Sequence, residues 1–539
     1  MPSDSTFFPY ISILVVLILA ASFPFFMMSD IASASGASSG NVYYENLAAG
    51  NTAAGNTAAL NTPPSPPDGV VLLIVDGLGS YYLFPELTGK SLENESAGHA
   101  YLHTISEMWE NGFRISRMKV PVPATESGHS VIMTGNRKAN AEIVSYTNST
   151  FLDVLREEGF ICIGVMQRGD FESMRNKFDV IIYDKTNSVN NMEFTIQKND
   201  FPASDPEITR RLVSAFEAQQ RNTSSYTNIK DTSEKYAAYN RFGLDAAALA
   251  LDVMENYPDQ KFILVINVGG TDSTGHYRGY YAYLDSVERL DADLEKLFEK
   301  CRRNNLLFIL TADHGMSFEA LDKKSGGHSS TKYSKTNESL YIPFIVFGNT
   351  IKSGAVYMPD CGQEDIAPTL LSIFEIRPAP RFSQGNILPA KKYASLYLEF
   401  PAAESFELYR QEGDRNVSVF STGDSFETFS AYSLSGLLPG NYLLKWENSG
   451  GNDYIRYELR LLIEKDTTVD LSDYLKKPAL ATLADFNSDT TLFSSLSLKD
   501  LSFAGFSSFK MTKTAGFLLI CFINIAGGAA IYNFYKKKK

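Results

Sequence analysis

Short, unbroken runs of apolar residues recur along the chain up to residue 347. They are VVLLIV (70–75), FICIGVM (160–166), FDVIIY (178–183), FILVINV (262–268), LLFILT (306–311) and YIPFIVF (341–347). These runs lack the alternation of a half-solvated strand, so they predict strands that are buried on both faces. Segments with helical spacing separate them, most plainly 283–303. The pattern predicts an α/β domain with a mostly parallel sheet sandwiched by helices.

A different pattern begins near residue 400. SVFSTG, YLLKWENSG and YIRYELRLLIE are short alternating runs, separated by turn residues such as those of GLLPGNY. We therefore expect the α/β domain to span 69–395 and a small antiparallel β-sandwich to span 400–475. The LPGNY turn resembles turns of the prealbumin-like accessory modules found in secreted and surface proteins.

Two longer apolar stretches flank these domains. Residues 7–28 carry no charge and are long enough to cross about 30 Å of hydrocarbon, as are residues 515–535, which four lysines follow. We predict an N-terminal transmembrane anchor at 7–28, or alternatively a signal peptide cleaved near ASASG, and a C-terminal transmembrane helix at 515–535. Because lysines favour the cytoplasmic side, the domains between the two spans are expected outside the cytoplasm of the cell membrane.

The segments beside these spans are polar and of low complexity. Residues 29–68 are rich in Ala, Gly, Ser, Asn and Thr and predict a flexible stalk, and residues 476–514 predict a serine-rich linker. An extracytoplasmic glycoprotein would agree with the Asn-x-Ser/Thr sequons, which lie at Asn94, Asn148, Asn222, Asn337 and Asn416.

Charge and cysteine content exclude some classes of function. The formal net charge of -13 argues against nucleic acid as a stable partner. The four cysteines are far apart in the sequence, so they form no metal-binding or disulfide framework and favour free thiols.

Acidic residues and histidines stand where the predicted strands end. Asp76 follows its apolar run directly, and the runs at 262–268 and 306–311 lead into GTDSTGH and TADHGM. In open parallel sheets, ligands bind at the carboxyl ends of the strands. We therefore expect the following candidate ligands to converge: Asp76, Asp272, His276, Asp313, His314 and His328.

These residue types suit a pair of divalent metal ions, with zinc favoured. We assign Asp76, Asp313 and His314 to one ion, and the set Asp272, His276 and His328 to the other. Thr125 heads the turn in VPATESGHSVIMTG and supplies a hydroxyl that a neighbouring metal could activate as a nucleophile and bind as a ligand. The pattern predicts phosphoryl-transfer chemistry on a phosphate-ester substrate.

Each motif taken alone also has a structural explanation. Asp before Gly is common in turns, and Thr125 or Ser127 could simply cap the following helix. The joint occurrence of the motifs after predicted strands favours a site. Of the other histidines, His129 is interpreted as packing behind the Thr125 turn, and His99 and His103 as surface or helix residues.

From about Gly69 to Ile387 these motifs, together with DIAPTLLSIFEI (365–376), resemble the alkaline phosphatase superfamily, most closely its type I phosphodiesterase/nucleotide pyrophosphatase branch. The resemblance implies a covalent phospho-threonine at Thr125 and hydrolysis of phosphodiester or pyrophosphate bonds. Sulfate-ester hydrolysis is not expected, because sulfatases need a modified Cys or Ser where Thr125 stands.

The turn after the nucleophile departs from that branch. The chain reads TESGH in place of a TFPNH-like segment, and no asparagine stands at the expected later position. Asn148 lies near that position but belongs to a sequon. Monoester against diester preference therefore stays open. TESGH and DSTGH also resemble ethanolamine-phosphate transferases of lipid-anchor synthesis, so a headgroup transferase acting on a lipid-linked or surface glycan is the first alternative. A non-catalytic surface protein is the second.

Overall fold

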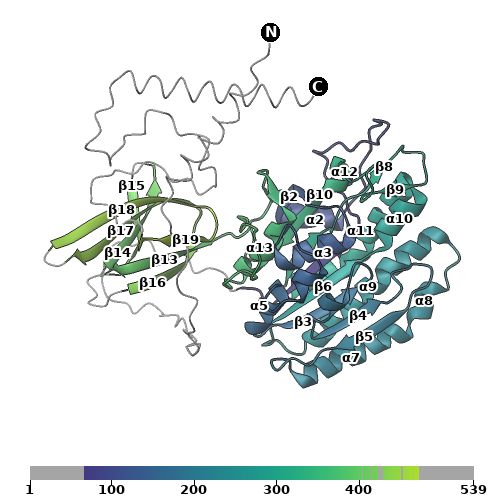
Figure 1. Cartoon of the computed structure of the whole chain (residues 1–539), viewed down its shortest axis with the longest axis horizontal. Coiled ribbons are helices and arrows are strands. Elements are labelled where there is room, and N and C mark those ends of the chain that lie inside the picture. The colour runs from purple at the N-terminus through teal and green to yellow at the C-terminus, as the bar shows by residue number, and fades with distance from the viewer. Residues whose placement is uncertain (1–65, 404, 414, 423–428, 451–452, 473–539) are drawn as a thin grey trace, which may run out of the picture. The chain divides into compact units, whose positions relative to one another are not determined.

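The computed structural model describes residues 66–472, except for 404, 414, 423–428 and 451–452 (Figure 1). Both predicted transmembrane spans, the stalk up to residue 65 and the linker at 476–514 lie outside the described residues. Among the helices of the described part, none is both long and apolar enough to cross a membrane.

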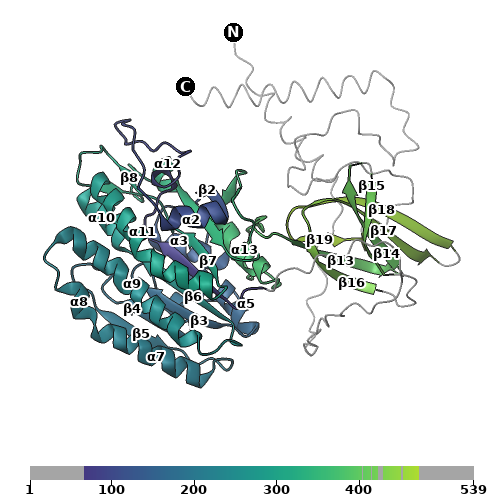
Figure 2. The same ribbon diagram turned by 180° about the vertical axis from the view of Figure 1, so that it is seen from behind.

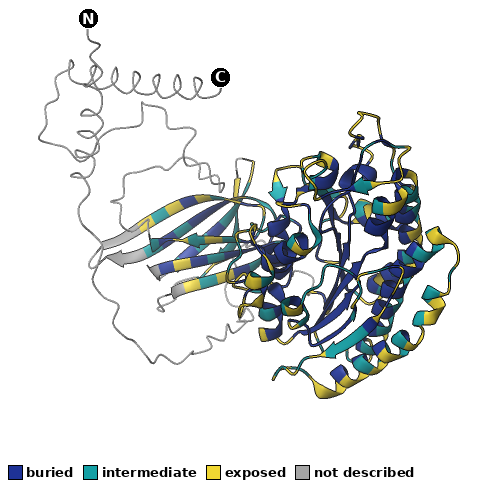
Figure 3. Cartoon of the chain, turned by 45° about the vertical axis from the view of Figure 1, so that its right-hand side comes forward, coloured by how far each residue is buried: buried dark blue, intermediate teal, exposed yellow. Residues whose placement is uncertain are grey.

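The larger body contains a mixed ten-stranded sheet. In spatial order its strands are β11 (Ala355–Val356), β2 (Phe113–Lys119), β10 (Tyr341–Phe347), β7 (Leu307–Thr311), β1 (Gly69–Val75), β6 (Phe262–Val268), β3 (Ile161–Met166), β4 (Val180–Asp184) and β5 (Phe194–Lys198), with β12 (Cys361–Gly362) also beside β2. Each predicted apolar run forms one of these strands. In β1, β3, β6 and β7 every residue is buried, as Figure 3 shows.

The centre of this sheet is parallel. β1 pairs in parallel with both β6 and β7, and β6 pairs in parallel with β3. β10 runs antiparallel to both of its neighbours, β7 and β2. The carboxyl ends of β7, β1, β6 and β3 therefore lie side by side at one edge, which is the position expected for a ligand site.

Helices cover both faces of the sheet (Figures 1 and 2). One group consists of α2 (Thr104–Asn111), α7 (Pro206–Arg221), α9 (Thr232–Met254) and α11 (Tyr280–Arg303), and the other of α3 (Thr125–Thr134), α5 (Phe151–Glu157) and α13 (Ile366–Ile373). The helix expected over 283–303 is α11. The predicted α/β class is confirmed.

Shorter elements connect these layers. They are η1 (Ser80–Tyr82), α4 (Ala141–Ser145), α6 (Glu172–Arg175), α8 (Thr223–Thr227), α10 (Gly270–Arg278), β8 (Ser317–Phe318), β9 (Gly326–Gly327), α12 (Asn337–Leu340) and η2 (Gln363–Asp365). Strand β2 was not predicted, because Arg and Lys side chains interrupt the apolar positions of its sequence, FRISRMK. These charged side chains are exposed or only partly buried.

The residues from Ala394 to Asp470 form two further sheets around their own buried cluster. One contains β16 (Phe429–Leu437), β13 (Ala394–Ala403) and β19 (Thr467–Asp470), and the other β15 (Arg415–Ser421), β14 (Ser405–Glu412), β17 (Gly440–Gly450) and β18 (Asp453–Ile463). This arrangement differs from the expected antiparallel sandwich in two ways. Its first strand begins before residue 400, and β13 pairs with β19 in parallel.

Candidate metal centre

The predicted ligands come together at the carboxyl ends of the central strands. Asp76 follows β1 directly, Asp313 lies two residues beyond β7, and Asp272 stands in the first turn of α10 after β6. All three carboxylates are fully buried. Strand order alone brings them close, because β7, β1 and β6 are neighbours in the sheet.

Asp76, Asp313 and His314 form the first ligand group. Each offers an atom within 4.8 Å of those of the other two. Asp313 Oδ1 accepts hydrogen bonds from the backbone N–H groups of Gly77 (3.1 Å) and His314 (2.9 Å), which leaves its Oδ2 free. His314 Nδ1 donates to the Gly315 carbonyl (3.0 Å). Because a carbonyl can only accept, this bond turns Nε2 of His314 toward the carboxylates as the ligand atom.

The second ligand group gathers around Asp272. His276 Nε2 lies 3.3 Å and His328 Nε2 lies 3.6 Å from Asp272 Oδ1. Asp272 and His276 are one turn apart in α10, so the DxxxH motif does place both side chains on one helix face. His328 Nδ1 donates to the Pro123 carbonyl (2.7 Å), which again directs Nε2 into the site.

His314 lies between the two groups. Its ring stacks on that of His328, with 3.6 Å between the ring centroids. The ligand atoms of His314 and His328 lie close enough to that of Asp272 to share one ion, and His314 is equally close to Asp76 and Asp313. The sequence motifs assign His314 to the first ion alone, whereas in the structure this imidazole borders both ligand groups.

The unpaired oxygens of these carboxylates test whether a cation fits. Asp76 Oδ1 and Oδ2, Asp272 Oδ1 and Asp313 Oδ2 are buried and have no hydrogen-bond partner within the described part of the chain. Buried polar atoms without partners are uncommon and call for a ligand, water or ion. Carboxylate and imidazole donors in this number suit divalent ions such as Zn²⁺, so the residues present fit a two-cation site.

Burial and crowding shift the titration of these groups. Burial, reinforced by Asp76, raises the pKa of Asp313 well above its usual value. Burial opposes the charge on His314, but Asp313 and Asp76 outweigh it and raise its pKa to about 10. Burial and the charge of His314 together lower the pKa of His328 to about 4. The metal-free site therefore carries a protonated His314 beside a neutral His328.

Thr125 opens α3 and faces the ligands. Its Oγ1 lies 3.1 Å from His314 Nε2, and its side chain is half-buried. The capping position is Ala124, which is extended and makes no side-chain cap, so neither Thr125 nor Ser127 caps the helix. The helix packs closely on the Asp313 segment, since an added Cβ at Gly128 would lie 2.3 Å from the Asp313 carbonyl. The hydroxyl is thus presented to the site at a helix N-terminus, where negative charge is favoured.

The remaining histidines stay outside the ligand groups. His129 is fully buried behind Thr125, with Nδ1 2.8 Å from the Thr125 carbonyl and 3.8 Å from Asp313 Oδ2, and burial lowers its pKa. His99 hydrogen-bonds the Leu87 carbonyl, and His103 directly precedes α2. Asn148 is exposed.

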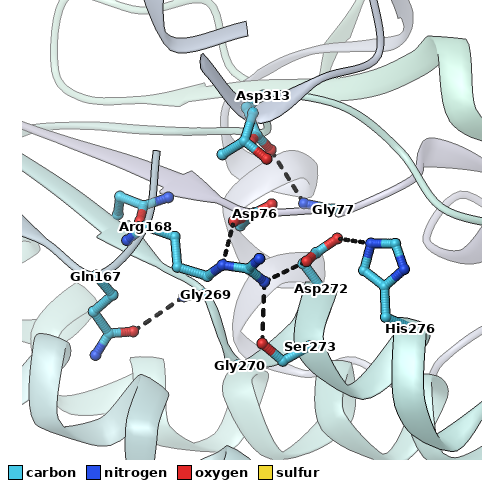
Figure 4. Close-up of polar contacts among 12 residues, drawn as sticks. Asp76, Gly77, Gln167, Arg168, Gly269, Gly270, Asp272, Ser273, His276 and Asp313 are labelled. Atoms are coloured by element: carbon cyan, nitrogen blue, oxygen red, sulfur yellow. Dashed lines mark hydrogen bonds and ion pairs between the residues drawn. The ribbon is translucent and has the colours of Figure 1, made fainter. Parts of the chain in front are cut away.

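Arg168 is a residue of the site that the sequence motifs did not identify. It follows β3, and its guanidinium lies between Asp76 and Asp272 (Figure 4). Its place just beyond a buried strand puts it at the carboxyl edge of the sheet, but the sequence does not show that it contacts the carboxylates.

Sequence similarity links the chain to 2,3-bisphosphoglycerate-independent phosphoglycerate mutases. It is 26% identical to that of Mycoplasma pneumoniae over 160 residues, which is 30% of each protein. It is 30% identical to that of Clostridioides difficile over 162 residues, again 30% of each. The chain therefore matches less than a third of the length of these curated relatives.

Solved structures with a similar arrangement include alkaline phosphatase PafA, at 15% identity and a TM-score of 0.42, covering 61% of this chain and 99% of that one. Phosphonate monoester hydrolase from Silicibacter pomeroyi shares 11% identity with a TM-score of 0.37, covering 74% of this chain and 90% of the other.

A family model described as the metalloenzyme superfamily matches residues 68–378. That is more than half of the chain and includes Thr125 and every predicted metal ligand. The predicted superfamily, that of alkaline phosphatase, is confirmed, whereas the nucleotide pyrophosphatase branch remains a prediction. The chain belongs to the metalloenzyme superfamily.

Proposed function

We propose that the protein is a two-metal phosphohydrolase that cleaves phosphodiester or pyrophosphate bonds, and phosphomonoesters as further substrates, through a phospho-threonine at Thr125. The observation that carries this proposal is the position of the Thr125 hydroxyl, 3.1 Å from His314 Nε2 and next to buried carboxylates with unpaired oxygens. A side chain that only capped a helix would not face such a cluster.

Each ligand group would bind one metal ion. Asp76, Asp313 and His314 would hold one cation with Thr125, and the Asp272 group, with His276 and His328, would hold the other. When bound, such ions stabilise charge on the phosphoryl oxygens and lower the pKa of an adjacent hydroxyl. Zinc is proposed because the donors are carboxylates and imidazoles in small sets.

The chain's own residues set the course of the reaction. The Thr125 oxygen forms the new O–P bond while the leaving oxygen keeps the electrons of the broken bond and takes up the hydroxyl proton. A water then attacks the same phosphorus and one of its protons returns to the Thr125 oxygen. The product released is a phosphomonoester when the substrate is a diester, and inorganic phosphate when it is a monoester. The N-terminus of α3 favours the charge that develops beside Thr125.

Replacing Thr125 tests the proposal directly. We expect Thr125→Ala to lower turnover of a nitrophenyl phosphodiester by at least about 10³-fold, because no other hydroxyl replaces the nucleophile. Thr125→Ser, which keeps the hydroxyl, is the matched control and should retain measurable turnover. Turnover, bound metal and folding are measured together, so wild-type activity in a folded, metal-loaded Thr125→Ala protein would contradict the proposal. Parallel assays with the monoester, with and without chelator, define the preferred ester.

Transfer to an alcohol is a second candidate. It is supported by the similarity to phosphoglycerate mutases, whose name describes movement of a phosphoryl group between hydroxyls. Hydrolysis predicts that the phosphomonoester (phosphate, for a monoester substrate) forms in proportion to the leaving group at any acceptor concentration. Transfer predicts a phosphorylated product when ethanolamine or glycerol is added, which phosphorus NMR would detect.

We also propose that this chemistry takes place outside the cytoplasm, on a protein tethered by residues 7–28 and 515–535. The support is the uncharged apolar character of both stretches and the lysines that follow the second. The asparagines of all five sequons are exposed, as glycosylation would require. Protease digestion of sealed cells or vesicles should remove the catalytic domain from the outer side, and protection of that domain would contradict the placement.

A further inference from the structure

Arg168 enters the metal centre from the end of β3 and has no part in the ligand assignments. Its backbone N–H donates to the Asn267 side chain (2.8 Å). Its stem packs on Gly269, where an added Cβ would lie 2.5 Å from Arg168 Cδ. With a side chain that is only 25% exposed, Arg168 is held on a fixed path toward the carboxylates.

The guanidinium contacts one carboxylate from each ligand group (Figure 4). Nε lies 3.7 Å from Asp76 Oδ2, and Nη1 forms an ion pair with Asp272 Oδ2. Nη1 also donates to Ser273 Oγ (3.1 Å). A planar guanidinium can span two acceptors in this manner, whereas the compact ammonium of a lysine cannot.

The other oxygens of the same carboxylates face the imidazoles. Asp76 Oδ1 lies 3.3 Å from His314 Nε2, and Asp272 Oδ1 lies 3.3 Å from His276 Nε2. Arg168 therefore lies on the Oδ2 side of both carboxylates, where it pairs with Asp272 Oδ2 and approaches Asp76 Oδ2 to 3.7 Å, and it leaves the Oδ1 atoms to a cation. It does not have to move when a cation arrives, but its positive charge repels that cation.

Charge balance gives this contact its importance. Asp76 and Asp272 are both fully buried, and buried like charges without compensation strongly destabilise a fold. A guanidinium stays protonated at every pH at which a protein is folded. Arg168 is thus a permanent positive charge in the centre before any metal is bound.

We propose that Arg168 is a positioning residue that acts as the internal counter-ion of the metal-free centre. It keeps the carboxylates of both ligand groups in place until divalent cations take over the compensation of their charge. The inference rests on the proposed two-cation site. It implies that Arg168 stabilises the metal-free protein far more than the loaded one, and that its removal tightens metal binding.

Thermal unfolding of the full chain in EDTA and in saturating Zn²⁺ tests this inference. We expect Arg168→Met to lower the Tm by several degrees in EDTA and much less in Zn²⁺. We also expect the metal-free variant to bind Zn²⁺ about tenfold or more tightly than wild type, because a repelling charge is gone. Arg175→Met is the matched control. Its side chain is similarly buried (22% exposed) and pairs with Asp170, so its loss should lower the Tm equally in both conditions.

Equal Tm losses for Arg168→Met in EDTA and Zn²⁺, or unchanged or weaker Zn²⁺ affinity, would overturn the inference. Where the Met variant does not fold in EDTA, Arg168→Lys decides. It keeps the charge but cannot span both carboxylates, so its Tm loss should be intermediate and larger in EDTA, and equal losses overturn the inference. A wild-type protein that binds no Zn²⁺ would instead overturn the proposed function, which separates the two failures.

Discussion

At the scale of single residues, the centre depends on glycines as well as on ligands. Gly169 has a positive φ of 71°, and an added Cβ would lie 2.5 Å from Thr125 Cγ2 and 2.6 Å from His129 Nδ1. The turn after Arg168 can therefore pass directly over Thr125 only because residue 169 has no side chain.

Gly169→Ala should therefore damage both stability and turnover. The left-handed backbone costs about 1–2 kcal/mol for alanine, and the new methyl group must push Thr125 or His129 aside. Gly159→Ala is the control, since Gly159 also has a positive φ of 84° but no atom lies within 4 Å of its added Cβ. Urea unfolding should show a similar backbone cost for both variants, and kcat should fall for Gly169→Ala alone. Normal kcat in that variant would contradict the close approach.

The pKa of His314 predicts proton release on metal binding. The pKa of His314 is raised to about 10 from an ordinary value near 6.5, so His314 is protonated in the metal-free protein at pH 8. The resulting stabilisation of the metal-free fold is present below pH 6.5 and is lost as the pH rises through 10.

A cation can bind Nε2 only after this proton leaves, so apparent metal affinity should rise with pH up to about 10. Titration calorimetry of Zn²⁺ at pH 8, in buffers of different ionisation enthalpy, should show release of at least one proton. His314→Gln should release fewer. Binding without proton release would mean that the imidazole is already neutral.

Single-residue reasoning from sequence named candidate ligands that the structure brings close together, but it did not identify Arg168. Asp76, Asp272 and Asp313 each follow an unbroken apolar run, and the end of such a run indicates where the carboxyl edge of the sheet lies. Arg168 follows β3 in the same way, yet an arginine after a strand is ordinary. Its significance comes from the contact with Asp76 and Asp272, which lie about a hundred residues away in either direction.

At the scale of elements, α11 supports the turn that carries Asp76. The Tyr283 hydroxyl donates to the Gly77 carbonyl (2.8 Å) and accepts from the Gly79 N–H (3.0 Å), and its ring is fully buried. The loop after β1 would otherwise have two buried backbone groups without partners.

Tyr283→Phe should lower the free energy of unfolding by about 1–3 kcal/mol, because both groups lose their partner in a dry environment. Tyr281→Phe, at a ring that is 67% exposed on the same helix, should have little effect. Chemical denaturation compares the two. A Tyr283→Phe protein as stable as the Tyr281→Phe control would show that water or a shifted backbone replaces the hydroxyl.

Strand β2 shows where the apolar pattern was insufficient at this scale. Its Arg114 packs its guanidinium over Phe84 and Trp109 and pairs with Glu86, so a charged residue is accommodated in a sheet position. Such compensation depends on partners from elsewhere in the chain, and local sequence does not reveal them.

At the scale of the whole molecule, the described residues form two separate buried apolar clusters, one within residues 70–390 and one within residues 394–471. Every candidate ligand lies within the residue range of the first cluster. Metal should therefore stabilise one part of the chain only, by about 4 kcal/mol at a Zn²⁺ concentration 1,000 times the dissociation constant.

Calorimetric unfolding should accordingly contain a transition that EDTA moves to lower temperature and a second that EDTA leaves unchanged. Thr125→Ala, which keeps the carboxylates and imidazoles, should preserve the metal-dependent shift. A single transition that moves as a whole would show that the two clusters unfold as one unit.

The sequence by itself determined the α/β class and the buried strands, and it named a hydroxyl and a set of carboxylates and imidazoles that the structure brings together. It could do so because burial on both faces imposes apolar runs, and because parallel strands end at a common edge. Only the tertiary structure decided that His314 borders both ligand groups, that Thr125 does not cap its helix, and that Arg168 lies between the carboxylates. These features depend on distances between segments that are remote in sequence. Side-chain packing and the register of neighbouring strands set those distances, and no local sequence pattern encodes them.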